Sequence, residues 1–201
     1  MRIQAALIGC GRIGSNKHLE AFLANRELLD LIAVCDLKPE RAERVADAYA
    51  TRAGKRPAVF TDYRKTLSAG IEMAAIATES GNHFTIAMDC LNSKVHTLVE
   101  KPMALSVSEM DGMVSEAKAR SVKLGVCFQN RFNPAVQEVV KKLRENAFGR
   151  VFTATARILW NRDEAYYKQA NWRGTWRFDG GTLMNQCSHN IDLLQWVLGG
   201  E

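Results

Sequence analysis

A glycine-rich turn near the start of the chain constrains its fold more than any other feature. The hexapeptide Gly9–Gly14 (GCGRIG) directly follows the apolar run Ile3–Ile8 and precedes a helical pattern. Here Gly9 allows a tight turn, Gly11 lets the backbone approach a diphosphate, and Gly14 lets a helix pack closely on a strand. The turn therefore predicts a dinucleotide-binding site. Its candidate cofactor-binding residues are Gly9, Gly11, Arg12, Ile13 and Gly14.

The same alternation of strand and helix patterns continues to about residue 128. The apolar runs are Ile3–Ile8, Leu31–Cys35, Met73–Ala77, His96–Val99 and Lys123–Phe128. Helical patterns lie near Ile13–Ala24, Glu40–Tyr49, Phe84–Leu91 and Ser106–Arg120, with a capping box predicted from Ser106 and Glu109. Strands separated by helices at this spacing predict an α/β fold, with a parallel sheet covered on both faces. Residues 1–128 are therefore predicted to form a Rossmann domain.

The pattern changes after residue 128, and residues 129–201 are predicted to belong to a second domain. A helical pattern runs from Pro134 to Leu143, a β-rich run from Val151 to Trp160, and a helix from about Leu183 to Leu198. A lone strand is unstable, so Val151–Trp160 requires further strands, either missing from this chain or supplied by another one.

Composition excludes several classes of protein. A chain of 201 residues that is 47% hydrophobic has room for one domain and part of another. Its net charge is +5, but the lysines and arginines are interleaved with acidic residues and form no basic block. Nucleic acid is therefore not an expected partner. No apolar run is long enough to span a membrane. Five cysteines without CxxC or zinc spacing indicate a reduced, cytoplasmic protein with no disulfide or metal.

Asp36 bears on the choice of cofactor. It ends the second predicted strand, where an acid can accept hydrogen bonds from the ribose hydroxyls and repel a 2′-phosphate. NAD is therefore expected rather than NADP. Lys38 and Arg41 lie close in sequence and leave the alternative open, since a phosphate could use them.

Two titratable residues are candidates for catalysis. Lys101 follows the strand His96–Val99, at the sheet edge where ligands of such folds bind. His189 has a pKa range suited to taking a proton near neutrality, with Asn185 and Asp192 expected on the same helical face. Position alone is also compatible with a non-catalytic interpretation, in which Lys101 is a surface lysine and His189 is a structural histidine.

Several motifs together go beyond a generic pattern. They are Gly9–Gly14, Cys35-Asp36, Thr61-Asp62-Tyr63, Ala77-Thr78 with His83, Glu100-Lys101-Pro102, and Gly180-Gly181 ahead of His189 and Asp192. With these motifs in this order, the chain resembles the Gfo/Idh/MocA oxidoreductases. The resemblance implies NAD as cofactor, with Thr78, His83 and Glu100 joining its site, and Lys101 and His189 as the catalytic pair. It also implies a cis Lys101–Pro102 bond.

The resemblance further implies that residues 129–201 begin an α+β domain with an open, mostly antiparallel sheet. Members of the family usually exceed 300 residues, so the chain is expected to be truncated. An exposed sheet edge could then pair between chains, and a homo-oligomer is expected.

Local strings resemble the branch that oxidises UDP-N-acetylglucosaminuronate at C3, for surface-polysaccharide synthesis. These strings are Phe128–Pro134, Trp172–Trp176 and Leu183–Gln186. The expected substrate-binding residues are Lys101, Asn130, Arg131, Trp172, Arg173, Asn185 and His189. Another sugar or polyol dehydrogenase, such as an inositol type, is the alternative enzyme. A non-catalytic NAD-binding fragment or regulator is the alternative class.

Overall fold

The computed structural model describes residues 1–199, which fall into two compact units. The first unit spans Met1–Val126 and the second begins at Cys127. None of the described helices is long and apolar enough to cross a membrane.

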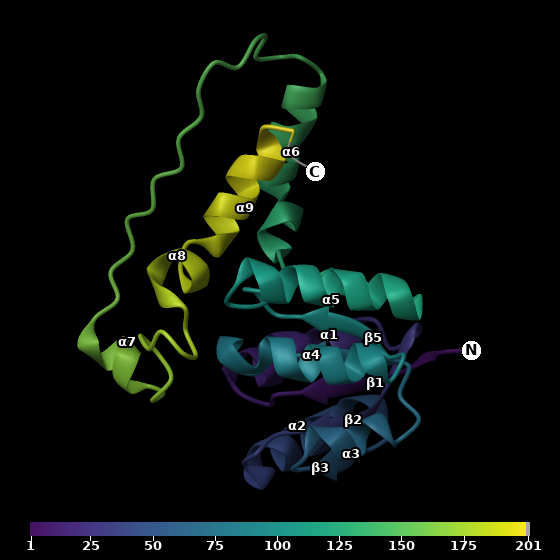
Figure 1. Cartoon of the computed structure of the whole chain (residues 1–201). Helices are drawn as coiled ribbons and strands as arrows, with labels where there is room; N and C mark the ends of the chain where they lie inside the picture. The colour runs from purple at the N-terminus through teal and green to yellow at the C-terminus, as the bar shows by residue number, and fades with distance from the viewer. Residues whose placement is uncertain (200–201) are drawn as a thin grey trace. The chain divides into compact units, whose positions relative to one another are not determined.

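Within the described residues of the first unit, six parallel strands form one sheet (Figure 1). They are β1 (Ile3–Ile8), β2 (Leu29–Cys35), β3 (Ala58–Phe60), β4 (Met73–Ile76), β5 (His96–Val99) and β6 (Leu124–Val126). The strand order is β3-β2-β1-β4-β5-β6, so successive strands are added on one side of β1 up to β3 and on its other side from β4 onward. The boundary between β1 and β4 is the switch point where ligands of doubly wound sheets bind. The predicted α/β Rossmann fold is confirmed. The sequence patterns missed β3, which has only three residues.

Helices connect these strands. They are η1 (Gly14–His18), α1 (Leu19–Ala24), α2 (Pro39–Ala53), α3 (Tyr63–Leu67), η2 (Ser80–Asn82), α4 (His83–Asn92) and α5 (Val107–Arg120). Pro39 occupies the first turn of α2, where its missing N–H has no partner to lose. The capping box at α5 is confirmed, because Ser106 accepts from the Glu109 backbone N–H while Glu109 accepts from the Ser106 N–H. The helix expected over Ile13–Ala24 forms, but η1 is a π-helical turn within it.

Apolar side chains bury both faces of the sheet. Successive residues of a strand point to opposite faces, so Ala6 and Ile8 of β1 pack on one side while Ala5 and Leu7 pack on the other. Helices α3, α4 and α5 cover the first face, and α1 and α2 cover the second. Complete burial of a side chain such as Leu7 stabilises the fold by about 1.5–3 kcal/mol. This packing fixes the strand ends on which the candidate site depends.

The regular elements of the second unit, among the residues that the structure describes, are helices. Its elements are η3 (Gln129–Phe132), α6 (Pro134–Arg144), α7 (Glu164–Lys168), α8 (Gly181–Asn185) and α9 (Ser188–Val197). Helix α9 contacts both α6 and η3, and α6 and α9 lie side by side in Figure 1.

Two details of this unit differ from the expected elements. Val151–Trp160 runs without helix or strand and is almost entirely exposed, because no neighbouring strand among the described residues supplies its hydrogen bonds. The open antiparallel sheet is therefore not formed by residues 127–199. The helix expected from Leu183 to Leu198 is divided into α8 and α9, with Gln186 and Cys187 between them.

Candidate functional site

The glycine turn has the geometry that a dinucleotide site requires. Gly9 has a φ of 98°, and a Cβ there would lie 2.6 Å from the backbone carbon of Ala77. A Cβ on Gly14 would lie 2.0 Å from the carbonyl oxygen of Gly9. By contrast, a Cβ on Gly11 would meet no atom within 4 Å. The first and last glycines are thus required by the fold, whereas the middle one borders open space that a ligand can approach.

Asp36 lies directly beside this turn. Its Oδ2 accepts a hydrogen bond of 2.8 Å from the Cys10 backbone N–H, and its Oδ1 accepts one of 2.9 Å from the Lys38 N–H. The carboxylate is therefore held at the carboxyl end of β2, next to the turn that follows β1. A carboxylate has lone pairs beyond these two bonds, so Asp36 can still accept from a diol.

The thiols beside the turn are not nucleophiles. Burial, with a smaller contribution from the Asp36 charge, raises the pKa of Cys10 and of Cys35 to about 12. Both side chains remain protonated at neutral pH and act as small apolar groups of the core.

His83 joins the loops that follow β4 and β5. Its Nδ1 lies 2.8 Å from the carbonyl oxygen of Pro102, and its Nε2 lies 3.2 Å from that of Thr78. The residue is 1% exposed, and burial lowers its pKa despite these acceptors. The expected role of His83 at the cofactor would thus be exercised through Thr78 or Pro102, since the ring itself is covered.

Glu100 is held by a residue that the sequence did not single out. Its Oε1 lies 3.0 Å from Nε2 of His18, which the π-helical turn η1 positions, and its Oε2 accepts from the Lys101 N–H at 3.3 Å. Burial alone would raise the pKa of Glu100, but the contacts with His18 and Lys101 outweigh it and lower that pKa. A histidine four residues after Gly14 was the available signal. The Lys101–Pro102 bond is cis, as expected.

In the second unit, His189 lies on α9 with 8% of its surface exposed. Its ring meets the Phe128 ring edge-on with centroids 5.9 Å apart, and its Nε2 lies 3.4 Å from Nε2 of Gln129. Asn185 ends α8, so the helix break separates it from His189, and the regular spacing assumed for these two residues does not hold. Gln129 lies within the string Phe128–Pro134 but is not among the site residues expected from the sequence.

Asp192 forms an ion pair with Arg131. The two side chains make hydrogen bonds of 2.8 and 2.5 Å, and the Arg131 guanidinium lies 5.3 Å from the centroid of the Trp196 ring. Asp192, expected on the same helical face as His189, uses both carboxylate oxygens for Arg131. Arg131, expected to bind the substrate, has its charge balanced within the protein. The ion pair between Arg131 and Asp192 exists only in the folded chain, and it argues against a direct role for either side chain at the substrate.

The remaining candidates for substrate binding are distributed over loops of the second unit. Asn130 is half-buried on η3. The guanidinium of Arg173 lies 4.8 Å from the Trp172 ring centroid and 4.4 Å from that of Tyr166. Trp172 and Arg173 are among the substrate-binding residues expected from the sequence, and Tyr166 is not.

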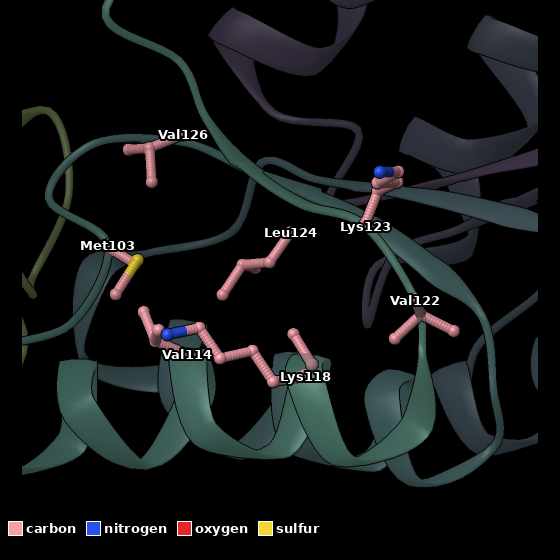
Figure 2. A pocket seen from close by; sticks show the side chains of 8 residues that line it. Met103, Val114, Lys118, Val122, Lys123, Leu124 and Val126 are labelled. Carbon is pink, nitrogen blue, oxygen red and sulfur yellow. The ribbon is translucent and has the colours of Figure 1, made fainter.

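A separate groove of about 330 Å³ lies between α5 and β6 (Figure 2). Met103, Val114 and Leu124 point into the space between the helix and the strand. None of the candidate cofactor or substrate residues lines it. It is therefore not part of the sites described above.

The sheet order, the glycine turn and Asp36 define a Rossmann-type dinucleotide-binding protein. Residues 3–128 match the family model described as an oxidoreductase family with an NAD-binding Rossmann fold. Residues 136–201 match the model of a GFO/IDH/MocA C-terminal domain. The chain belongs to the Gfo/Idh/MocA family of oxidoreductases, which confirms the family expected from its motifs.

Three relatives show the range of this similarity. The WlbA dehydrogenase from Chromobacterium violaceum, whose crystal structure contains NADH and UDP-GlcNAcA, is 36% identical with a TM-score of 0.88, over 98% of this chain and 56% of that chain. UDP-N-acetylglucosamine 3-dehydrogenase of Acidithiobacillus ferrooxidans is 28% identical over 100% of this chain and 56% of its own length. Inositol 2-dehydrogenase/D-chiro-inositol 3-dehydrogenase of Lactiplantibacillus plantarum is 24% identical over 98% of this chain and 53% of its own length.

The chain thus spans about half the length of the relatives it matches. NAD, the expected cofactor, is confirmed at the level of the family, by the NAD-binding description of its first domain and by the NADH in the similar structure. The residues present fit this cofactor, because Gly11 borders open space beside a carboxylate fixed at the end of the neighbouring strand.

Proposed function

We propose that this protein is an NAD-dependent dehydrogenase that oxidises a sugar ring hydroxyl. The observation that supports it best is the open backbone at Gly11, with Asp36 fixed beside it and Glu100-Lys101 at the end of another strand of the same parallel sheet. The carboxyl ends of parallel strands lie on one edge of a sheet. A dinucleotide bound along that edge would extend from the acid that holds its ribose towards Lys101.

The proposed chemistry uses two side chains. NAD, when bound, accepts a hydride from the carbon that bears the hydroxyl group. We assign His189 to take the hydroxyl proton and Lys101 to stabilise the negative charge that develops on the oxygen. An exchange of these two roles is the alternative. Glu100 contributes indirectly, because its Oε2 accepts from the backbone N–H of Lys101 and so fixes the start of this loop.

For the substrate we propose UDP-N-acetylglucosaminuronate, oxidised at C3 in surface-polysaccharide synthesis. Support comes from the 36% identity to a dehydrogenase crystallised with UDP-GlcNAcA, together with the local strings around Arg131, Trp172 and Asn185. Inositol or another polyol is the rival substrate, favoured by the 24% identical inositol dehydrogenase. A fragment or regulator that binds NAD without turnover is the rival class. The cytoplasmic location and the homo-oligomer stay predictions.

The experiment combines binding with turnover. NAD, NADH and NADP are titrated by fluorescence, and NADH formation is then followed with UDP-N-acetylglucosaminuronate, myo-inositol and glucose. We expect NAD to bind and the nucleotide sugar to give the highest kcat/KM. NAD binding without turnover on any substrate would favour the non-catalytic class.

Lys101→Met tests the assignment of the lysine. We expect turnover to be abolished while the Kd for NAD changes little, because the lysine is assigned to the reacting oxygen and not to the dinucleotide. Lys118→Met, on the exposed face of α5, is the matched control and should retain full turnover. Unchanged turnover in Lys101→Met would refute the assignment.

A further inference from the structure

Two arginines of the second unit surround one tyrosine, in a group that we call the Tyr166 cluster: Arg162, Tyr166, Arg173 and Gln186. The Arg173 Nη1 donates to the Tyr166 hydroxyl at 2.5 Å, and the Gln186 Nε2 donates to it at 2.9 Å. The Arg162 Nε donates to Oε1 of Gln186 at 3.1 Å. Residues from α7, α8 and the segments around them are thus joined into one network.

The network has more donors than acceptors. The Tyr166 hydroxyl accepts from Arg173 and from Gln186, so its own hydrogen must be donated elsewhere. Neither of these two bonds uses the hydroxyl hydrogen, and the buried Nε of Arg173 has no hydrogen-bond partner among the described residues. Unpaired donors at a partly buried position are costly unless an acceptor binds to them.

Its positive charge is also not balanced. Among residues 1–199, neither Arg162 nor Arg173 is within ion-pair distance of a carboxylate, whereas Arg131 in the same unit is paired with Asp192. Asp163, next to Arg162, accepts from the Tyr166 backbone N–H as the cap of α7. Asp179, the nearest acid to Arg173 in sequence, accepts from the Gly174 backbone N–H at 2.8 Å and forms no ion pair with Arg173.

Aromatic rings fix the two guanidinium groups in place. Arg173 lies over Tyr166 and Trp172, and Arg162 lies over Trp160 and Tyr166 at 5.0 Å from each ring centroid. A guanidinium stacked on a ring keeps its N–H groups in its own plane, directed outward at the edge. These donors are therefore oriented before a ligand arrives, which favours an anion with several oxygens.

We propose that the Tyr166 cluster is an oxyanion-binding subsite for the substrate, occupied by its diphosphate or its carboxylate. This inference rests on the proposed function, since a nucleotide sugar acid carries both groups. Gln186 directly follows Asn185, so the cluster is covalently continuous with a candidate substrate residue. The donors of Arg162, Tyr166 and Arg173 bind the anion, and Arg131, already paired, does not.

The test measures binding calorimetrically on the full chain with NADH at saturation, so that the glycine turn is occupied. The probes are inorganic pyrophosphate, UDP-N-acetylglucosaminuronate, UDP-N-acetylglucosamine and glucuronate. UDP-N-acetylglucosamine keeps the diphosphate without the carboxylate, and glucuronate has the carboxylate alone. The probe whose affinity is lost in the cluster variants identifies which group occupies the subsite.

We expect Arg162→Gln and Arg173→Gln each to weaken binding about tenfold to a hundredfold, the range of a charge-assisted hydrogen bond. Tyr166→Phe removes only the hydroxyl and should cost about fivefold even where an arginine variant disturbs the loop. Arg157→Gln, an exposed arginine of the preceding segment, and Tyr167→Phe are the matched controls, and both should bind as wild type does.

The outcomes separate the two proposals. Loss of pyrophosphate binding in the cluster variants, in a protein that oxidises none of the sugars, would support the subsite and refute the proposed function. Turnover with an unchanged KM in Arg162→Gln, Arg173→Gln and Tyr166→Phe would refute the subsite and leave the proposed function standing. Equal losses in the control variants, or no binding of any probe to wild type, would also overturn the subsite.

Discussion

The Nε2 atom of His18 lies 3.0 Å from Oε1 of Glu100 and so joins two segments that are 82 residues apart. His18 belongs to the π-helical turn that follows the glycine turn, and Glu100 follows β5 and precedes Lys101. Both side chains are largely buried, with 8% and 16% of their surfaces exposed. The contact therefore couples the dinucleotide turn to the loop of the candidate catalytic lysine.

Removal of this contact should destabilise the first unit. We expect a double-mutant cycle of His18→Ala and Glu100→Ala, followed by urea unfolding, to give a coupling energy of about 1–3 kcal/mol, because each single variant leaves a buried polar group unpaired. The exposed pair Arg26 and Glu27, 3.8 Å apart, is the control and should couple by less than about 0.5 kcal/mol. A coupling no larger than that control would show that the contact is not stabilising.

The glycines of the turn should separate folding from binding. Gly14→Ala places a Cβ against the carbonyl of Gly9 and should lower the free energy of unfolding by about 1–3 kcal/mol. Gly11→Ala meets no protein atom, so we expect normal unfolding but weaker NAD binding. Gly112→Ala within α5 meets only Phe84 at 3.8 Å and should be neutral or stabilise by about 1 kcal/mol. Normal NAD affinity in Gly11→Ala would contradict the placement of the dinucleotide.

Asp36→Ser should change the preference between cofactors. Loss of the carboxylate removes an acceptor for the ribose hydroxyls and the charge that repels a 2′-phosphate. We expect NAD affinity to fall about tenfold while the NADP-to-NAD affinity ratio rises, as fluorescence titration would show. Asp111→Ser, on the exposed side of α5, should leave both affinities as they are. An unaltered ratio in Asp36→Ser would argue that the acid does not face the ribose.

His83 should make the stability of the first unit depend on pH. Burial lowers the pKa of this ring, so below about pH 6.5 the unfolded chain binds a proton that the folded chain does not, and stability falls as the pH falls. His83→Gln cannot take up that proton. We expect wild type to lose up to about 1.4 kcal/mol per pH unit more than the variant between pH 6.5 and the lowered pKa. Parallel stability curves in urea unfolding at pH 8 to 5 would exclude this contribution.

Arg131→Gln should destabilise the second unit. The Asp192 carboxylate, with 10% of its surface exposed, would lose its charged partner, at a cost of about 3–5 kcal/mol. The double variant Arg131→Gln with Asp192→Asn should recover much of this stability, because it removes the uncompensated charge. Unfolding should be followed by tryptophan fluorescence, since Trp196 contacts Arg131. A double variant no more stable than Arg131→Gln would mean that the charge is not the cause.

The sequence by itself determined the local elements: the glycine turn, the alternation of strands and helices in the first unit, and the capping box of α5. These follow from steric and hydrogen-bonding rules within a few residues. Pairing between distant residues was decided by the tertiary structure, because topology brings such partners together. His18 meets Glu100, three residues pair with β2 to form β3, and Val151–Trp160 finds no partner among the described residues. The sequence predicts a substrate-binding role for both Arg131 and Arg173. In the folded chain Arg131 forms an ion pair with Asp192, whereas Arg173 forms no ion pair with a carboxylate within residues 1–199. An arginine is available for an anion only when no internal acid balances its charge, and the chain must fold before that is settled.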